Sequence, residues 1–176
     1  HAAKRAASEK RLFDKHSERT AAEADWRLAI SGDVTDLIEK GEMHLAFQPK
    51  FDLRAQKVIG AEALMRWTHA GFGNVPPSDF IPLAEQGSAI VDLTEFALRQ
   101  SLVALGEFRK IDPAFVVAVN LSPVLLDDHL LFERLLQIID EAGYESSAIM
   151  FEIAEAARIS NVARGIGILE SMVEKG

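Results

Sequence analysis

The chain has 176 residues, 48% of them hydrophobic, with no cysteine and a formal net charge of −8 at pH 7. It is long enough to bury roughly 70% of its unfolded surface in one domain, and the lack of cysteine excludes disulfides, thiolate metal sites, iron–sulfur clusters and cysteine nucleophiles. The acidic balance argues against polymeric nucleic acid as a partner, and no apolar run approaches the ~20 residues of a membrane-spanning helix.

Residues 1–40 are predicted to form a helical connector. Most of this segment is charged and alanine-rich, a composition typical of helix. Gly32 is expected to break the helix, and Asp33 or Thr35 to cap a short second one. The segment carries equal numbers of acidic and basic side chains, so the whole net charge lies in residues 41–176, which we predict to be a separate domain.

Strands and helices alternate through this second part. Strands are predicted where apolar residues run together, at 43–51, 58–64, 114–119 and 148–153. Helices are predicted to open at Ser78, after Gly87, at Asp127 or Asp128, and at Asn161. This alternation is typical of βαβ units around a parallel sheet, and continuous apolar strands indicate a sheet that is covered on both faces. An open doubly wound sheet and a (β/α) barrel both fit, although the glycine-rich loop usual in the first is absent.

Three of the predicted strands end on a side chain that carries an oxygen ligand. These side chains are Glu62, Asn120 and Glu152. In a barrel the carboxyl ends of the strands converge on one face, where active sites lie. Two carboxylates and an amide form a hard oxygen set that suits Mg²⁺ or Mn²⁺ rather than zinc or copper. The alternative is ion pairing, of Glu62 with Arg66 and of Glu152 with Arg158.

The same strand ends lie within five motifs that follow one another along the chain. They are QPK from Gln48, GAEALMRW from Gly60, FIPLAE from Phe80, VNLSP from Val119 and FEIAE from Phe151. Over about residues 42–176, this series closely resembles the EAL domain, a family of bacterial phosphodiesterases that linearise the second messenger cyclic di-GMP. Five blocks in the same order argue against a chance match.

The resemblance implies a fold and a metal site. The fold is α/β, a (β/α) TIM-like barrel of the EAL type whose first strand is antiparallel to the others. Glu62, Asn120 and Glu152 match the family's metal ligands, for two Mg²⁺ or Mn²⁺ ions. Glu62 and Glu152 would then act in catalysis through the metal.

The resemblance also implies residues that bind the dinucleotide. Gln48, Leu64 and Arg66 match these positions, and Arg66 suits the role physically because a guanidinium can fork onto a phosphate. Glu155 matches a glutamate that steadies a loop beyond the next strand. Trp67 is expected either to stack on a base or to pack in the core.

The implied function is metal-dependent hydrolysis of cyclic di-GMP to the linear dinucleotide, in cytoplasmic signal transduction, by the intact protein. Two alternatives stay open: a degenerate domain that binds cyclic di-GMP as a receptor or regulatory module, and a scaffold that makes dimer contacts through residues 82–108. The retained Glu62 favours the enzyme. Ala154 and Ala156 replace the family's usual Thr and Ser, which favours the receptor. A second copy of the chain and an upstream GGDEF or sensory domain are further expected partners, and the protein as a whole can be membrane-anchored.

An EAL-type barrel takes about 250 residues, so the chain is expected to hold its N-terminal half, with the barrel incomplete. The family's next segment supplies an Asp-Asp-Phe-Gly motif and further lysine, glutamate and glutamine residues around the metals, and this motif does not occur in the chain. We therefore expect the stretch 1–176 to be inactive when it is isolated.

Overall fold

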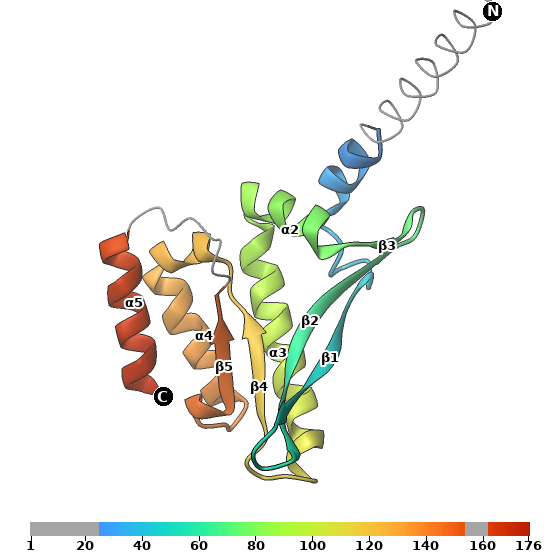
Figure 1. Cartoon of the computed structure of the whole chain (residues 1–176). Helices are drawn as coiled ribbons and strands as arrows, with labels where there is room; N and C mark the ends of the chain where they lie inside the picture. The colour runs from blue at the N-terminus through green and yellow to red at the C-terminus, as the bar shows by residue number, and fades with distance from the viewer. Residues whose placement is uncertain (1–24, 154–161) are drawn as a thin grey trace, which may run out of the picture.

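The structure, a computed structural model, describes residues 25–153 and 162–176 of the chain. Within these ranges one mixed sheet packs against helices (Figure 1). The strands are β1 (Met43–Asp52), β2 (Lys57–His69), β3 (Gly73–Val75), β4 (Val116–Asn120) and β5 (Ile149–Glu152). The helices are α2 (Pro77–Gln86), α3 (Ala89–Arg109), α4 (His129–Glu141) and α5 (Val162–Lys175), with 3-10 turns η1 (Pro123–Asp127) and η2 (Ser146–Ala148).

Some of the predictions concern residues outside the described ranges. They are the first part of the helical connector (1–24), the departures at Ala154 and Ala156, the role of Glu155, the ion pair of Arg158 and the cap at Asn161. All of them stay predictions.

The sheet has the order β1-β2-β4-β5, and β3 pairs with the end of β2. β1 runs antiparallel to β2, whereas β4 runs parallel to both β2 and β5. Helices α3 and α4 connect the parallel pairs, as expected for βαβ units. The antiparallel first strand that the resemblance implies is therefore confirmed.

Side chains of β2 alternate between the core and the opposite face of the sheet. Odd-numbered residues from Ala61 to Trp67 are at most 9% exposed, whereas even-numbered residues from Glu62 to Arg66 are only half-buried. The prediction that both faces are covered is therefore wrong along β2, but it is confirmed at the centre of β4, where Val117, Ala118 and Val119 are all buried.

The covered face of the sheet packs on α3. This helix, which lies beside α4 in Figure 1, contacts β1, β2 and β4. Its buried apolar residues are Ala89, Ile90, Leu93, Ala97, Leu98, Leu102 and Leu105. Each fully buried leucine contributes roughly 1.5–3 kcal/mol, so α3 supplies much of the core. In the described part of the chain, no helix is both long and apolar enough to cross a membrane.

Of two predicted helix caps, one is confirmed and the other is wrong. Asp128 caps α4 as predicted, because its side chain accepts a hydrogen bond from the backbone N–H of Leu131. Ser78 does not cap α2, which begins at Pro77 after Pro76. Proline at the first helical position needs no cap of its own, since it has no N–H to satisfy and its φ already suits a helix.

The segment before β1 also corrects two predictions. Helical residues run from 25 to 33, so Gly32 does not break the helix, and residues 34–41 form turns instead of a second helix. The segment ends where Gly41 adopts φ +68°, and the N–H groups of Gly41 and Glu42 bond the carbonyls of Ile38 and Leu37. This is the hydrogen-bond pattern of a Schellman motif, in which glycine is favoured because the left-handed conformation costs it nothing.

This segment packs on the far end of β2. The strand is longer than the predicted 58–64, because β1 keeps pairing with it as far as Met43 opposite Trp67. Trp67 is fully buried, and its indole Nε1–H donates to the Glu42 carboxylate at 2.8 Å. The second Glu42 oxygen accepts from the N–H of Ala70 at 2.9 Å. Trp67 therefore packs in the core, which decides between the two roles expected of it.

Asp33 ties the same segment to the last residue of β2. Its carboxylate accepts from Lys40 at 2.5 Å and lies 3.0 Å from His69 Nε2. His69 Nδ1 accepts the N–H groups of Gly71 and Phe72, so Nε2 carries the proton that Asp33 binds. Hydrogen bonds from Lys40 first and His69 second lower the pKa of Asp33. Asp33 therefore acts as a link to β2 and not as the predicted helix cap.

Gly60 is required where β2 meets β4. It pairs with Val116, and a Cβ added at Gly60 would lie 2.5 Å from the Val116 carbonyl oxygen. That distance is too short for a carbon and a backbone oxygen, so any side chain would push the two parallel strands apart.

We expect Gly60→Ala to destabilise the fold by about 1–3 kcal/mol, the usual cost of overpacking a tight site. Gly167→Ala in α5 is the matched control, because nothing lies within 4 Å of its added Cβ. That variant should gain about 0.5–1 kcal/mol from helix propensity. Urea unfolding of both variants measures the difference, and equal midpoints would contradict the steric argument.

Glu42→Gln should make the protein less stable at pH 7 and less sensitive to acid. The Trp67 indole N–H, followed by the Ala70 N–H, holds the pKa of Glu42 below its usual value, against the opposing effect of desolvation. A carboxyl with a lowered folded-state pKa stabilises above the usual glutamate value of about 4.3 and loses that contribution as pH falls through the lowered one.

A glutamine oxygen can accept only one of the two donors well, so we expect a loss of about 1–2 kcal/mol at pH 7. The difference from wild type should shrink below pH 4. Urea titrations across this pH range measure it, with Glu39→Gln on the exposed neighbouring turn as the control. A gap that stays constant with pH would contradict the role of the Glu42 charge.

Candidate functional site

The predicted site residues share the face of the sheet that α3 leaves open. Gln48 lies opposite Glu62 in the β1–β2 pair, and Asn120 lies opposite Glu152 in the β4–β5 pair. Directly opposed residues project to the same side of a sheet, and residues two apart along a strand do so as well. We define the inner face by Gln48, Lys50, Glu62, Leu64, Arg66, Asn120 and Glu152.

Glu62 is held by Asn120 from the neighbouring strand. Asn120 lies two residues beyond Ala118, the partner of Glu62, and its Nδ2 donates to Glu62 Oε1 at 2.8 Å. Arg66 makes no ion pair with Glu62. It donates instead from a terminal guanidinium nitrogen to the Met65 carbonyl at 2.9 Å. The ion-pairing alternative for Glu62 is therefore not observed.

Glu152 pairs with Lys50, a residue to which the sequence analysis gave no role. The Lys50 ammonium donates to Glu152 Oε1, and the two side chains are 35% and 31% exposed. Lys50 lies two residues after Gln48 on the same face of β1, a spacing that could have drawn attention to it. The other proposed partner, Arg158, lies outside the described residues.

The contact between Lys50 and Glu152 also indicates that the sheet is curved. It joins β1 to β5, the two outer strands of the order β1-β2-β4-β5. Neighbouring strands are about 4.8 Å apart, so a flat sheet would separate β1 from β5 by roughly 14 Å. Two side chains meet across that span only if the sheet curves around the inner face, as the wall of a barrel does.

The carboxyl ends of β4 and β5 are fixed by further hydrogen bonds. The N–H of Leu121 donates to the Glu152 carbonyl at 2.8 Å. Ser122 Oγ donates to Glu85 Oε1 at 2.5 Å, which connects the end of β4 to α2. These bonds hold the backbone that carries Asn120 and Glu152 at two strand ends, whereas Glu62 lies in the middle of the longer β2 and not at its end, as the sequence predicted.

The inner-face residues form an incomplete set of ligands for a cation. No group of three or more His, Asp or Glu side chains within residues 25–153 and 162–176 is arranged to hold a metal ion. Two carboxylates and one amide converge instead, and Asn120 keeps Oδ1 as an acceptor because Nδ2 bonds Glu62. The ammonium on Glu152 indicates that this carboxylate already has a cation as its partner. The oxygen donors therefore fit Mg²⁺ or Mn²⁺ as part of a larger set.

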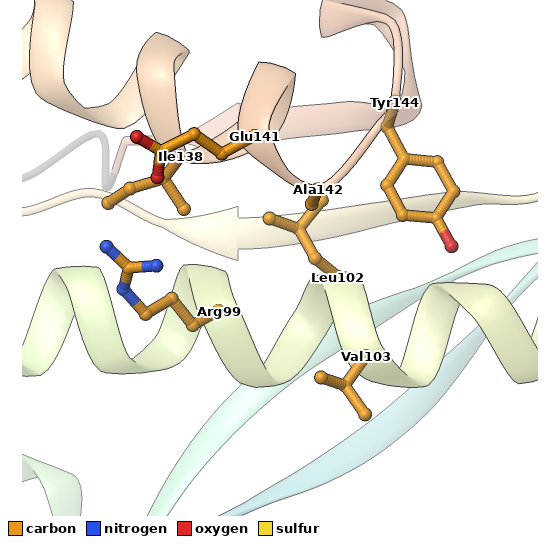
Figure 2. Close-up of a pocket in the computed structure, with 7 residues that line it drawn as sticks. All are labelled: Arg99, Leu102, Val103, Ile138, Glu141, Ala142 and Tyr144. Carbon is orange, nitrogen blue, oxygen red and sulfur yellow. The ribbon is translucent and has the colours of Figure 1, made fainter.

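A pocket lies on the covered side of the sheet, between α3 and α4 (Figure 2). It is lined by Arg99, Leu102, Val103, Ile138, Glu141, Ala142 and Tyr144. None of the residues predicted from the strand ends or motifs contributes to it, so we assign the candidate site to the inner face.

Comparisons with known proteins point to one family. A sequence model of the EAL domain matches residues 31–173. An uncharacterized protein of Mycobacterium tuberculosis is 30% identical over 165 residues, which is 93% of this chain and 54% of that protein. A cyclic di-GMP phosphodiesterase of Pseudomonas aeruginosa is 30% identical over 120 residues, which is 68% of this chain and 20% of that protein. The chain thus spans about half or less of the length of these relatives.

A solved structure is similar over most of the fold. The PaMucR phosphodiesterase, in its complex with c-di-GMP, superposes with a TM-score of 0.75 and 27% sequence identity. The match covers 84% of this chain and 60% of the other. The arrangement of strands and helices around the inner face is therefore shared with a protein whose structure contains a cyclic dinucleotide.

Proposed function

The chain belongs to the EAL domain family, and on this basis we propose that the intact protein hydrolyses one phosphodiester of cyclic di-GMP with the help of Mg²⁺ or Mn²⁺. Its curved sheet is part of the TIM-like barrel of that family. The observation that carries the proposal is that Glu62, from the middle of β2, lies beside Asn120 and Glu152, from the ends of β4 and β5, on the inner face. Relatives named as cyclic di-GMP phosphodiesterases support the choice of reaction.

Glu62, Asn120 and Glu152 would hold the metal. Glu62 and Glu152 offer carboxylate oxygens, and Asn120 offers Oδ1 while its Nδ2 keeps Glu62 in position. When bound, divalent ions activate a water molecule and offset the charge of the phosphate. The surrounding half-buried inner face limits the water around these oxygens, which strengthens their interaction with any cation.

The substrate would lie further along β2, on the same face. Arg66 uses one terminal nitrogen for the Met65 carbonyl, and its guanidinium makes no other hydrogen bond to the described residues. The remaining N–H groups can therefore fork onto a phosphate. Leu64, two residues beyond Glu62 on β2, offers an apolar contact. The exposed amide of Gln48, opposite Glu62 on β1, offers a hydrogen bond.

A receptor that binds cyclic di-GMP without cleaving it is the second candidate. The observation in its favour is the replacement of two expected hydroxyl residues by Ala154 and Ala156, next to Glu155. Without those hydroxyls, the sequence around Glu155 has fewer side-chain groups that can form hydrogen bonds. Binding and hydrolysis are therefore measured separately.

The intact protein, incubated with cyclic di-GMP and Mn²⁺, should release the linear dinucleotide, detected by chromatography. Glu62→Gln should lower kcat by roughly 100-fold or more, because a neutral amide is a poorer metal ligand although it keeps the shape of the side chain. Glu95→Gln, on the partly exposed side of α3, is the control and should leave the rate unchanged. Tight binding without product would overturn the hydrolase and support the receptor.

Arg66→Gln should weaken binding of cyclic di-GMP by roughly tenfold or more, since a charge-assisted hydrogen bond contributes about 1.5–3 kcal/mol. Calorimetry on the Glu62→Gln background measures this without turnover. Arg54→Gln, in the exposed turn between β1 and β2, removes the same charge away from the inner face and should leave the affinity unchanged. Equal losses of affinity in both variants would mean that Arg66 acts only through the net charge of the protein.

A further inference from the structure

The inner face carries a cation of its own. Lys50 lies opposite Gly60 in the β1–β2 pair, two residues along from the pair of Gln48 and Glu62 and on the same face. Its side chain extends across the sheet to the carboxyl end of β5 and binds Glu152. The contact joins residues 102 positions apart in the chain, so the tertiary fold creates it.

The pair is sheltered enough for its charges to matter. Both side chains are about two-thirds buried. Partly buried charges are screened by salt and water less than surface pairs are. Removing one partner would therefore leave the other charge with a poorly compensated environment.

The two carboxylates of the inner face differ in the charge of their partners. Glu62 accepts a hydrogen bond from the neutral amide of Asn120, whereas Glu152 faces the ammonium of Lys50. A divalent cation can approach Glu62 without losing any ion pair. To bind Glu152 as well, it must approach an ammonium group that is already bound to Oε1 and carries the same sign of charge.

We propose that Lys50 is a resident counter-cation that competes with the divalent metal for Glu152. Before metal binds, Lys50 holds the Glu152 carboxylate over the inner face and offsets its charge. When metal binds, Lys50 gives up this carboxylate, so its charge sets how much metal is needed to fill the site. This inference rests on the proposed function, because it takes Glu152 to be a metal ligand.

Binding of Mn²⁺ to the intact protein, without nucleotide, tests the competition. Loss of the electron paramagnetic resonance signal of free Mn²⁺ measures the affinity. Lys50→Gln removes the competing charge, and we expect roughly tenfold tighter binding, since like charges a few ångströms apart in a partly buried site repel by more than a surface pair does. If Lys50 had only a structural role, its replacement would weaken Mn²⁺ binding.

Two further variants isolate the charge of Lys50 as the cause. Lys57→Gln removes an ammonium that pairs with Asp112 at 3.4 Å near the start of β2, and its Mn²⁺ affinity should equal that of wild type. Lys50→Arg keeps the positive charge and should bind Mn²⁺ close to the wild-type affinity. Lys50→Met is a second neutral variant, which replaces Lys50→Gln if that variant unfolds in the absence of metal.

The outcomes separate this inference from the proposed function. Measurable Mn²⁺ binding that is unchanged or weaker in the neutral Lys50 variants overturns the competition and leaves the metal-dependent site intact. Tighter binding in Lys50→Arg as well would also overturn it, because charge would not be the cause. Absence of Mn²⁺ binding in wild type and every variant overturns both proposals.

Discussion

The strict alternation of side chains along β2 is the constraint on which the site depends. Each odd-numbered residue from Ala61 to Trp67 is buried against the helices, which leaves each even-numbered residue on the inner face. A shift of one residue in the pairing of β2 would exchange the two sets and bury Glu62 and Arg66 in the core. The packing of Trp67 and the close contact at Gly60 therefore stabilise the fold and also fix the direction of the functional side chains.

The curvature of the sheet also gives the carboxylates of the inner face their partners. Two carboxylates on one half-buried surface are costly unless each has a partner. Asn120 contacts Glu62 from the adjacent strand, and Lys50 contacts Glu152 from the opposite edge of the sheet, on the same face. The first contact needs only neighbouring strands, whereas the second needs a barrel-like curve. The site is thus built to hold negative charge close to a cation.

The segment before β1 is packed against the end of β2 and hydrogen-bonded to it. Ile30 and Leu37 are fully buried in the same core as Trp67, and Glu42 and Asp33 bond residues at the end of that strand. Arg66, the proposed phosphate ligand, immediately precedes Trp67.

The sequence by itself determined the family and the order of most strands and helices, because these are properties of local motifs and of periodicity. Apolar runs located four of the five strands but not the short β3, and the positions of Glu62, Asn120 and Glu152 in or after those runs identified them as candidate ligands. What the tertiary structure decided was which groups meet across strands. It replaced the ion pair of Glu62 and Arg66 with a bond from Asn120, buried Trp67 on Glu42, and brought Lys50 to Glu152. These contacts depend on register and curvature, which arise only when distant strands pair, and no local pattern in the chain encodes them.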